Sequence, residues 1–230
     1  MAIKPELISE LEKKELIIAD TVSVTSTTTL GASELSFIPA KSFHITTRGR
    51  PVFHLPLPPF ELEIVIHSFD GSVAYTSKCT KRSSGNCVLS GADGKSLIST
   101  SYFFGPSKDL LLCRLDVAPG TTYEIKTTSK WTSRDHTFSL PDGRTFAWQY
   151  KREVGFGAKG TKGTALALVF EGKRFAALIR NDETRTPGSK CCSAGNGGEL
   201  VLSEHADGKN GLAEEVVIAI CLLMLKKEID

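Results

Sequence analysis

Basic side chains between Arg144 and Lys190 form the part of this sequence best suited to binding chemistry. The stretch holds ten Lys and Arg residues and four acids, a local net charge of +6 against +2 for the whole chain. Within it, the glycine-rich run from Gly155 to Gly160 offers successive backbone amides that can surround an anion. Basic residues close to a membrane each add about 1 kcal/mol to the attraction of anionic lipid. The candidate lipid- or anion-binding residues are Lys151, Arg152, Lys159, Lys162, Lys173 and Arg174. A solvated loop with scattered surface charge is the alternative interpretation.

The run from Gly155 to Gly160 also matches the dinucleotide fingerprint G-x-G-x-x-G. That fingerprint requires a helix directly after the glycines, because the helix N-terminus binds the pyrophosphate. Here the β-type run Thr164–Phe170 follows, and the segment contains no Gly-Lys-Thr or Gly-Lys-Ser. The sequence therefore predicts neither a dinucleotide cofactor nor a phosphate-binding P-loop.

Metal-binding and catalytic spacings are missing from the sequence. The five histidines show no H-x-x-x-H and no paired Cys/His spacing, and there is no G-x-S-x-G elbow. Lys190 can lower the thiol pKa of the neighbouring Cys191 modestly, but a surface-loop cysteine without a function is the simpler interpretation. We expect a non-enzymatic protein without metal or cofactor. The alternative is an enzymatic or small-molecule-binding β-barrel with a pocket at its mouth.

The number of cysteines and the N-terminal sequence indicate in which cellular compartment the protein is expected. Six cysteines in 230 residues are too few for a disulfide scaffold, and we expect reduced thiols. The first twenty residues lack the apolar stretch of a secretory signal and contain four glutamates, which mitochondrial transit peptides avoid. We therefore expect a cytoplasmic protein. The near balance of 28 basic and 26 acidic residues argues against a duplex-DNA partner.

Most of the chain has the pattern of short β-strands. Asp-Gly pairs such as Asp70-Gly71, Asp93-Gly94 and Asp142-Gly143 separate β-branched and aromatic runs, which is typical of hairpins. About a dozen strands are predicted: Leu16–Thr25, Phe43–Thr46, Leu62–His67, Val73–Thr80, Ser96–Thr100, Leu110–Asp116, Thr122–Thr127, His136–Leu140, Thr145–Arg152, Thr164–Phe170, Arg174–Asn181 and Glu199–Ser203. No helical pattern separates these runs, so a parallel βαβ sheet is not expected. The Pro-rich stretch Pro51–Pro59 is interpreted as a rigid connection or edge segment.

Two segments have helical features. The N-terminal segment 1–15 contains a short amphipathic pattern, and residues 16–230 are expected to form a single domain. The second helix is predicted at Leu212–Lys227, with Asn210 as its cap, acids in its first turn and lysines in its last. Its centre, Val216–Leu225, is apolar without interruption, so it must be buried on all sides. Ten apolar residues are too few to cross a bilayer, which takes about 20. The sequence therefore predicts a closed antiparallel barrel of about twelve strands around this helix.

Three sequence features resemble the tubby-like C-terminal superfamily, which includes tubby domains, phospholipid scramblases and LURP-one-related proteins. They are the run from Phe138 to Trp148 (FSLPDGRTFAW), the hairpin from Leu166 to Ala176 (LALVFEGKRFA) and the C-terminal helix. The resemblance covers roughly residues 35–230 and is nearest to fungal tubby-like proteins of unassigned role. It implies a barrel of about twelve strands threaded by its C-terminal helix.

The resemblance also bears on function. Tubby domains bind phosphoinositide head groups through basic residues, although no tubby lipid-binding motif aligns with this sequence residue by residue. We therefore expect a cytoplasmic binding module, peripheral at membranes, whose partner is an anionic phospholipid or a protein.

Overall fold

The computed structural model describes residues 37–51, 62–81, 85–103, 110–118, 120–129, 135–154, 161–189, 192–204, 206 and 212–229. Several predictions fall outside these residues: the segment 1–15, the strand Leu16–Thr25, the candidate site residue Lys159, the helix cap Asn210 and Cys191.

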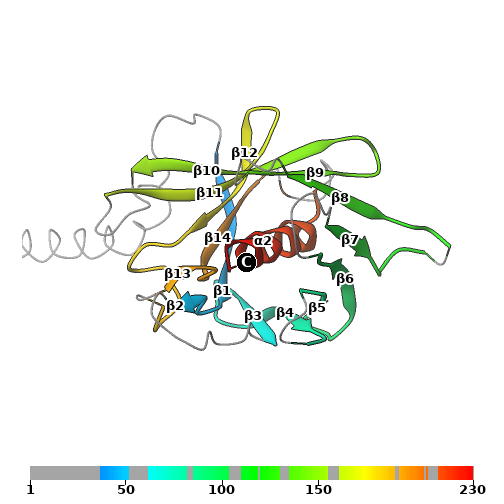
Figure 1. The fold of residues 1–230 in the computed structure, drawn as a ribbon, viewed down its shortest axis with the longest axis horizontal. Coiled ribbons are helices and arrows are strands. Elements are labelled where there is room, and N and C mark those ends of the chain that lie inside the picture. The colour runs from blue at the N-terminus through cyan, green and yellow to red at the C-terminus, as the bar shows by residue number, and fades with distance from the viewer. Residues whose placement is uncertain are drawn as a thin grey trace, which may run out of the picture.

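Within the described residues the chain forms β-strands and one C-terminal helix (Figure 1). The elements are β1 (Pro39–Thr46), β2 (Arg50–Pro51), β3 (Glu63–Ser68), β4 (Val73–Cys79), β5 (Cys87–Gly91), β6 (Ser96–Ser101), β7 (Leu111–Arg114), β8 (Glu124–Ser129), β9 (His136–Ser139), β10 (Thr145–Val154), β11 (Lys162–Phe170), β12 (Lys173–Ile179), β13 (Cys192–Ala194), β14 (Gly198–Ser203) and α2 (Glu214–Ile229). The predicted helix is therefore confirmed, with its start two residues later.

Twelve of the strands close into an antiparallel barrel, as predicted. Their order around the barrel is β1-β14-β12-β11-β10-β9-β8-β7-β6-β5-β4-β3, and β2 pairs with β13 outside it. Tight turns permit this arrangement: Gly71 and Gly143 follow aspartates and have φ of 81° and 87°, which other residues adopt only at a cost. Closure pairs β1 with both β14 and β3, so the sheet has no free edge.

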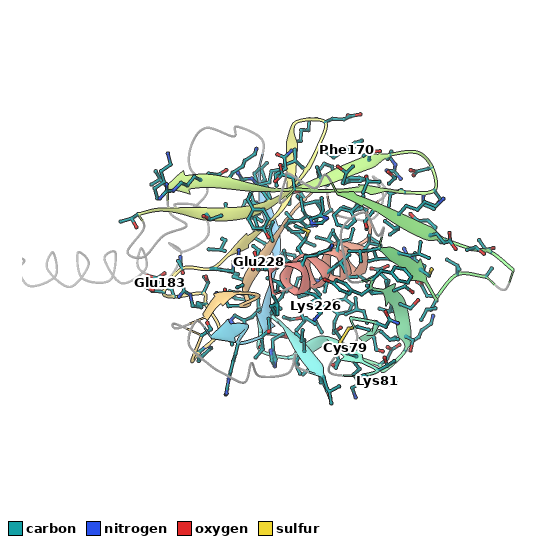
Figure 2. All side chains as sticks on the ribbon, viewed as in Figure 1. Cys79, Lys81, Phe170, Glu183, Lys226 and Glu228 are labelled. Carbon is teal, nitrogen blue, oxygen red and sulfur yellow. A yellow bond between two sulfur atoms is a disulfide. The ribbon has the colours of Figure 1, made fainter. Side chains whose placement is uncertain are left out.

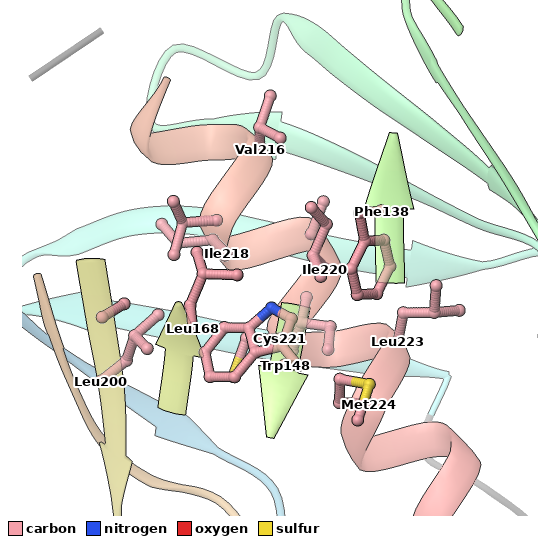
Figure 3. Close-up of a cluster of buried hydrophobic side chains, with 14 of the residues drawn as sticks. Phe138, Trp148, Leu168, Leu200, Val216, Ile218, Ile220, Cys221, Leu223 and Met224 are labelled. Atoms are coloured by element: carbon pink, nitrogen blue, oxygen red, sulfur yellow. The ribbon is translucent and has the colours of Figure 1, made fainter. Parts of the chain in front are cut away.

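Helix α2 is the centre of the hydrophobic core. Its residues from Val216 to Leu225 are all buried, as an all-round apolar surface requires. Figure 3 shows several of these side chains, including Ile218, Ile220 and Cys221, among Phe138, Trp148, Leu168 and Leu200 from the surrounding strands. None of the helical structure in the described residues reaches the length and hydrophobicity of a membrane span.

The first turn of α2 is tied to the barrel wall by its two acids. Glu214 accepts hydrogen bonds from the Tyr75 hydroxyl at 2.6 Å and from Lys41 Nζ at 2.7 Å. Glu215 accepts one from Arg114 Nη2 at 2.6 Å. Carboxylates are favoured at a helix N-terminus by the helix dipole, and here they also fix the helix to β1, β4 and β7.

Two sequence-based expectations are corrected. Reduced thiols were expected throughout, but Cys79 and Cys87 form a disulfide, while Cys113 and Cys221 are free. The reason is register: β4 and β5 are hairpin neighbours, and Cys79 lies directly opposite Cys87. Strand β5 was also not predicted, because the run Cys87–Gly91 is short and ends in glycine.

Candidate functional site

The barrel has two rims, defined by the two ends of α2. Because neighbouring strands are antiparallel, the start of one strand and the end of the next lie at the same rim. The N-terminal rim surrounds the start of α2, where Tyr75 contacts Glu214. The C-terminal rim surrounds its end, where the Tyr150 hydroxyl donates a hydrogen bond to Glu228 at 2.8 Å. Each charged side chain of the described strand ends can therefore be assigned to one rim.

The two rims differ in charge. At the C-terminal rim, the described bases are Arg48, Lys78, Lys81, Lys151, Arg152, Lys162, Arg180, Arg185, Lys226 and Lys227, and the acids are Glu63, Asp135, Glu153, Asp182, Glu183, Glu199 and Glu228. At the N-terminal rim, the bases are Lys41, Lys95, Arg114, Arg144, Lys173 and Arg174, and the acids are Asp70, Asp93, Asp116, Glu124, Asp142, Glu171, Glu204, Glu214 and Glu215. Bases are in excess at the C-terminal rim and acids at the N-terminal rim, so the C-terminal rim favours anions.

The structure brings together only part of the predicted basic site. Lys151, Arg152 and Lys162 lie on the β10–β11 hairpin at the C-terminal rim. Lys173 pairs with Phe170 at the opposite end of β11, about 26 Å along a strand of this length. It therefore belongs to the N-terminal rim and not to the same cluster.

Arg174 is also unsuited to binding an external anion. Its side chain is only 3% exposed, and Nη2 donates to Glu153 Oε1 at 2.6 Å. Its guanidinium also lies 5.9 Å from the centre of the Phe37 ring. A buried guanidinium that is already paired with a carboxylate has little left to offer a ligand.

Three residues form what we call the hairpin patch: Arg152, Val154 and Lys162. Val154 lies directly opposite Lys162, and Arg152 directly opposite Thr164. Since side chains alternate between the faces of a strand, Arg152 and Val154 lie on the same face of β10 as Tyr150, closer to the end of the hairpin. Val154 is 65% exposed, and both basic side chains are exposed without an ion-pair partner among the described residues.

The hairpin patch stands on a rigid base. Glu228 accepts hydrogen bonds from Tyr150, from Arg180 Nη1 at 2.6 Å and Nη2 at 2.9 Å, and from the Gly195 amide at 2.9 Å. Burial alone would raise the pKa of Glu228, but the Arg180 charge and these hydrogen bonds lower it. Burial, followed by the Glu228 charge, raises the pKa of Tyr150. The network therefore combines an ionised carboxylate with a neutral phenol (Glu228 is labelled in Figure 2).

A second basic group lies at the end of α2. Lys226 Nζ is 5.6 Å and Lys227 Nζ 5.8 Å from the centre of the Tyr102 ring. The following residue, Phe103, is an exposed aromatic side chain. The sequence predicted these lysines only as favourable to the helix dipole, because nothing local indicates that β6 ends beside them.

Comparisons with protein-family models, with curated proteins and with solved structures found no match for this chain. Among the residues that the structure describes, no group of three or more His, Cys, Asp or Glu side chains is arranged to hold a metal ion.

Proposed function

We propose that the protein is a peripheral binding module that recognises anionic phospholipid surfaces through the C-terminal rim of its barrel. The observation that carries the proposal is the hairpin patch, where exposed Val154 lies between the exposed basic side chains of Arg152 and Lys162. A membrane surface offers phosphates for the basic groups and an acyl boundary for the apolar side chain.

Charge distinguishes the two rims as docking faces. Exposed apolar residues occur at both, including Phe69 and Leu115 at the N-terminal rim. However, Asp70 follows Phe69 and Asp116 follows Leu115, so an anionic surface is repelled there. At the C-terminal rim Leu62 also precedes an acid, Glu63, but Val154 lies beside Arg152 and opposite Lys162 across the hairpin. Together with the excess of bases at this rim, that makes it the favoured face.

The architecture supports the resemblance to tubby-like proteins, since a barrel closed around its own C-terminal helix is what that resemblance implies. We include membership of that superfamily in the proposal, and the cytoplasmic leaflet as the target surface, because its anionic lipids give it a negative potential.

Co-sedimentation with vesicles tests the proposal. Wild-type protein is expected to bind vesicles of phosphatidylserine and phosphatidylcholine and not vesicles of phosphatidylcholine alone. Removing both charges of the hairpin patch (Arg152→Gln with Lys162→Gln) should weaken binding about 30-fold, from about 1 kcal/mol per basic residue. Higher salt should weaken wild-type binding as well.

A matched control removes the same charge from the other rim. Lys95→Gln with Lys173→Gln changes the net charge equally, but both residues lie at the N-terminal rim. This variant should bind vesicles nearly as well as wild type. An equal loss from both pairs would show that net charge alone drives binding, and the assignment to the C-terminal rim would be wrong.

A further inference from the structure

Strand pairing ends unevenly at the C-terminal rim. Closure leaves the barrel itself without a free edge, but the hairpin of β10 and β11 continues past the neighbouring strands (Figure 1). Strand β10 pairs with β11 as far as Val154, whereas its pairing with β9 stops at Trp148. Among the described residues, the last six of β10 therefore have a neighbouring strand on one side only.

One hydrogen bond identifies which main-chain groups face the open side. The Tyr150 amide donates to Asp135 Oδ1 at 3.1 Å, and Asp135 directly precedes β9. In an antiparallel strand the N–H and C=O of one residue point to the same side, and that side alternates along the strand. The main-chain groups of Arg152 and Val154 therefore face the open side, where no described strand pairs with them.

The open side has the geometry for one more strand. At Tyr150, a carboxylate oxygen of Asp135 already takes the place that the carbonyl of a further strand would occupy. The next two positions, Arg152 and Val154, are exposed. A strand added beside them would gain up to about four main-chain hydrogen bonds, the mode of recognition in which a peptide extends a sheet.

Charge decides which kind of strand fits this edge. Arg152 lies on the edge strand and Lys162 on the strand behind it, and both side chains are exposed. The acid between them in β10, Glu153, is already used, because its Oε1 accepts from Arg174 Nη2 at 2.6 Å. A second copy of the chain would bring its own basic residues to the same edge, which disfavours self-pairing. An acidic strand is complementary to it.

We propose that the open edge of β10 binds an extended acidic segment of a partner protein, which joins the sheet as an additional strand. The main chain of that segment pairs with Arg152 and Val154, and its carboxylates lie beside Arg152 in the positive potential of Lys162. This interaction goes beyond the proposed membrane binding, since it uses the main chain of the hairpin and needs no lipid.

Amide hydrogen exchange, followed by NMR without vesicles, tests the proposal. The probe is a short blocked peptide of alternating threonine and glutamate. The amides of Arg152 and Val154 should exchange at least tenfold more slowly with saturating peptide than without it. The Glu153 amide is the internal control, because Glu153 faces β11 and should be protected in both states. Unchanged exchange at Arg152 and Val154 would refute the proposal.

Two further peptides separate strand pairing from charge. A glutamate opposite Arg152 directs its own main chain at β10, so N-methylation of the glutamates removes the pairing donors and keeps the carboxylates. Lysine in place of glutamate keeps the donors and reverses the charge. Each peptide should bind at least tenfold more weakly than the original. Equal binding of the methylated peptide would show that charge alone attracts it, and equal binding of the lysine peptide would exclude an acidic partner. Either result overturns the proposal.

Proline substitution tests the edge from the side of the protein. Val154→Pro removes one main-chain donor but keeps Arg152 and Lys162, and it should weaken peptide binding at least tenfold. Thr164→Pro is the matched control on the other edge of the hairpin, where β12 pairs with β11 only from Leu166 onward. Proline is tolerated at such edge positions, and Thr164→Pro should bind as wild type does. Unchanged binding by folded Val154→Pro would refute the proposal. If that variant does not fold, the exchange result for wild type decides. Because no lipid is present, failure here leaves the vesicle result unaffected.

Discussion

Glu228 and Arg180 meet in a two-pronged ion pair, in which Nη1 donates to Oε2 at 2.6 Å and Nη2 to Oε1 at 2.9 Å. The carboxylate belongs to the last turn of α2, and the guanidinium follows the last residue of β12. Tyr150 and the Gly195 amide use the remaining acceptor positions of the same carboxylate. Glu228 therefore fixes the end of the central helix to one side of the C-terminal rim, formed by β10, the end of β12 and the segment before β14.

Substitution of Glu228→Gln should destabilise the fold by about 3 kcal/mol, because it leaves the buried Arg180 charge without its counter-ion. Urea denaturation at pH 7 measures the change. Glu183→Gln is the matched control, since Glu183 is exposed and its side chain has no partner among the described residues. A loss below 1 kcal/mol would mean that the pair is not needed to hold the helix.

The same substitution should alter acid stability. The folded-state pKa of Glu228 lies below its ordinary value of 4.5. Its contribution is therefore present above pH 4.5 and is lost as pH falls through the lower folded value. The Glu228→Gln variant should show a shallower decline in unfolding free energy below pH 4.5 than wild type. Parallel declines would show that other carboxylates dominate the acid limb.

His136 gives a second pH effect in a different range. Burial, followed by the Lys227 charge, lowers the pKa of His136 to about 4. Because the unfolded chain binds a proton on His136 more readily, protonation favours unfolding. The contribution of the neutral imidazole to the free energy of unfolding is therefore fully present above pH 6.5 and is lost as pH falls from 6.5 to about 4. At pH 5 the expected cost is about 2 kcal/mol.

A variant without the imidazole identifies this effect. His136→Leu should lose about 2 kcal/mol less than wild type between pH 7.5 and pH 5, measured by urea denaturation at both values. His67→Leu is the comparison, because His67 is only half-buried on β3. Equal pH dependence in wild type and His136→Leu would assign the decline to other groups.

The barrel and its helix could be predicted from local patterns, whereas the site could not. The apolar run Val216–Leu225 requires burial on all sides, and Asp-Gly turns set the hairpins, so both signals are contained in short segments. Arg180 meets Glu228 only because strand pairing around the closed barrel places the end of β12 beside the end of α2. No segment of the sequence contains that information.

The basic cluster illustrates the same limit. Lys162 and Lys173 are eleven residues apart in the sequence, and composition alone groups them. A nine-residue strand separates them in space and assigns them to different rims. Arg174, adjacent to Lys173 in sequence, is instead used inside the protein as the partner of Glu153.

The disulfide between Cys79 and Cys87 should be measurable as missing thiols. Without reductant, the unfolded chain should offer at least two fewer reactive thiols than after reduction, because Cys79 and Cys87 are paired. Removing the bond with Cys79→Ser and Cys87→Ser together should cost about 2.5 kcal/mol, from the entropy of closing a loop between residues eight apart. Cys113→Ser, which removes a free cysteine, should leave stability within about 0.5 kcal/mol of wild type. Equal thiol counts before and after reduction would show that the bond does not form.

The central position of α2 predicts a large cost for small losses of volume. Ile220 is fully buried, and Ile220→Ala should destabilise by about 2–5 kcal/mol, because the closed barrel cannot collapse onto the space left behind. Leu115, at the N-terminal rim, is 47% exposed, and Leu115→Ala should cost about 0.5 kcal/mol or less. Denaturant unfolding followed by Trp fluorescence measures both, since Trp148 lies in the same core. If Ile220→Ala costs no more than Leu115→Ala, the helix is not enclosed by the strands, and both rims lose the definition on which the proposed sites depend.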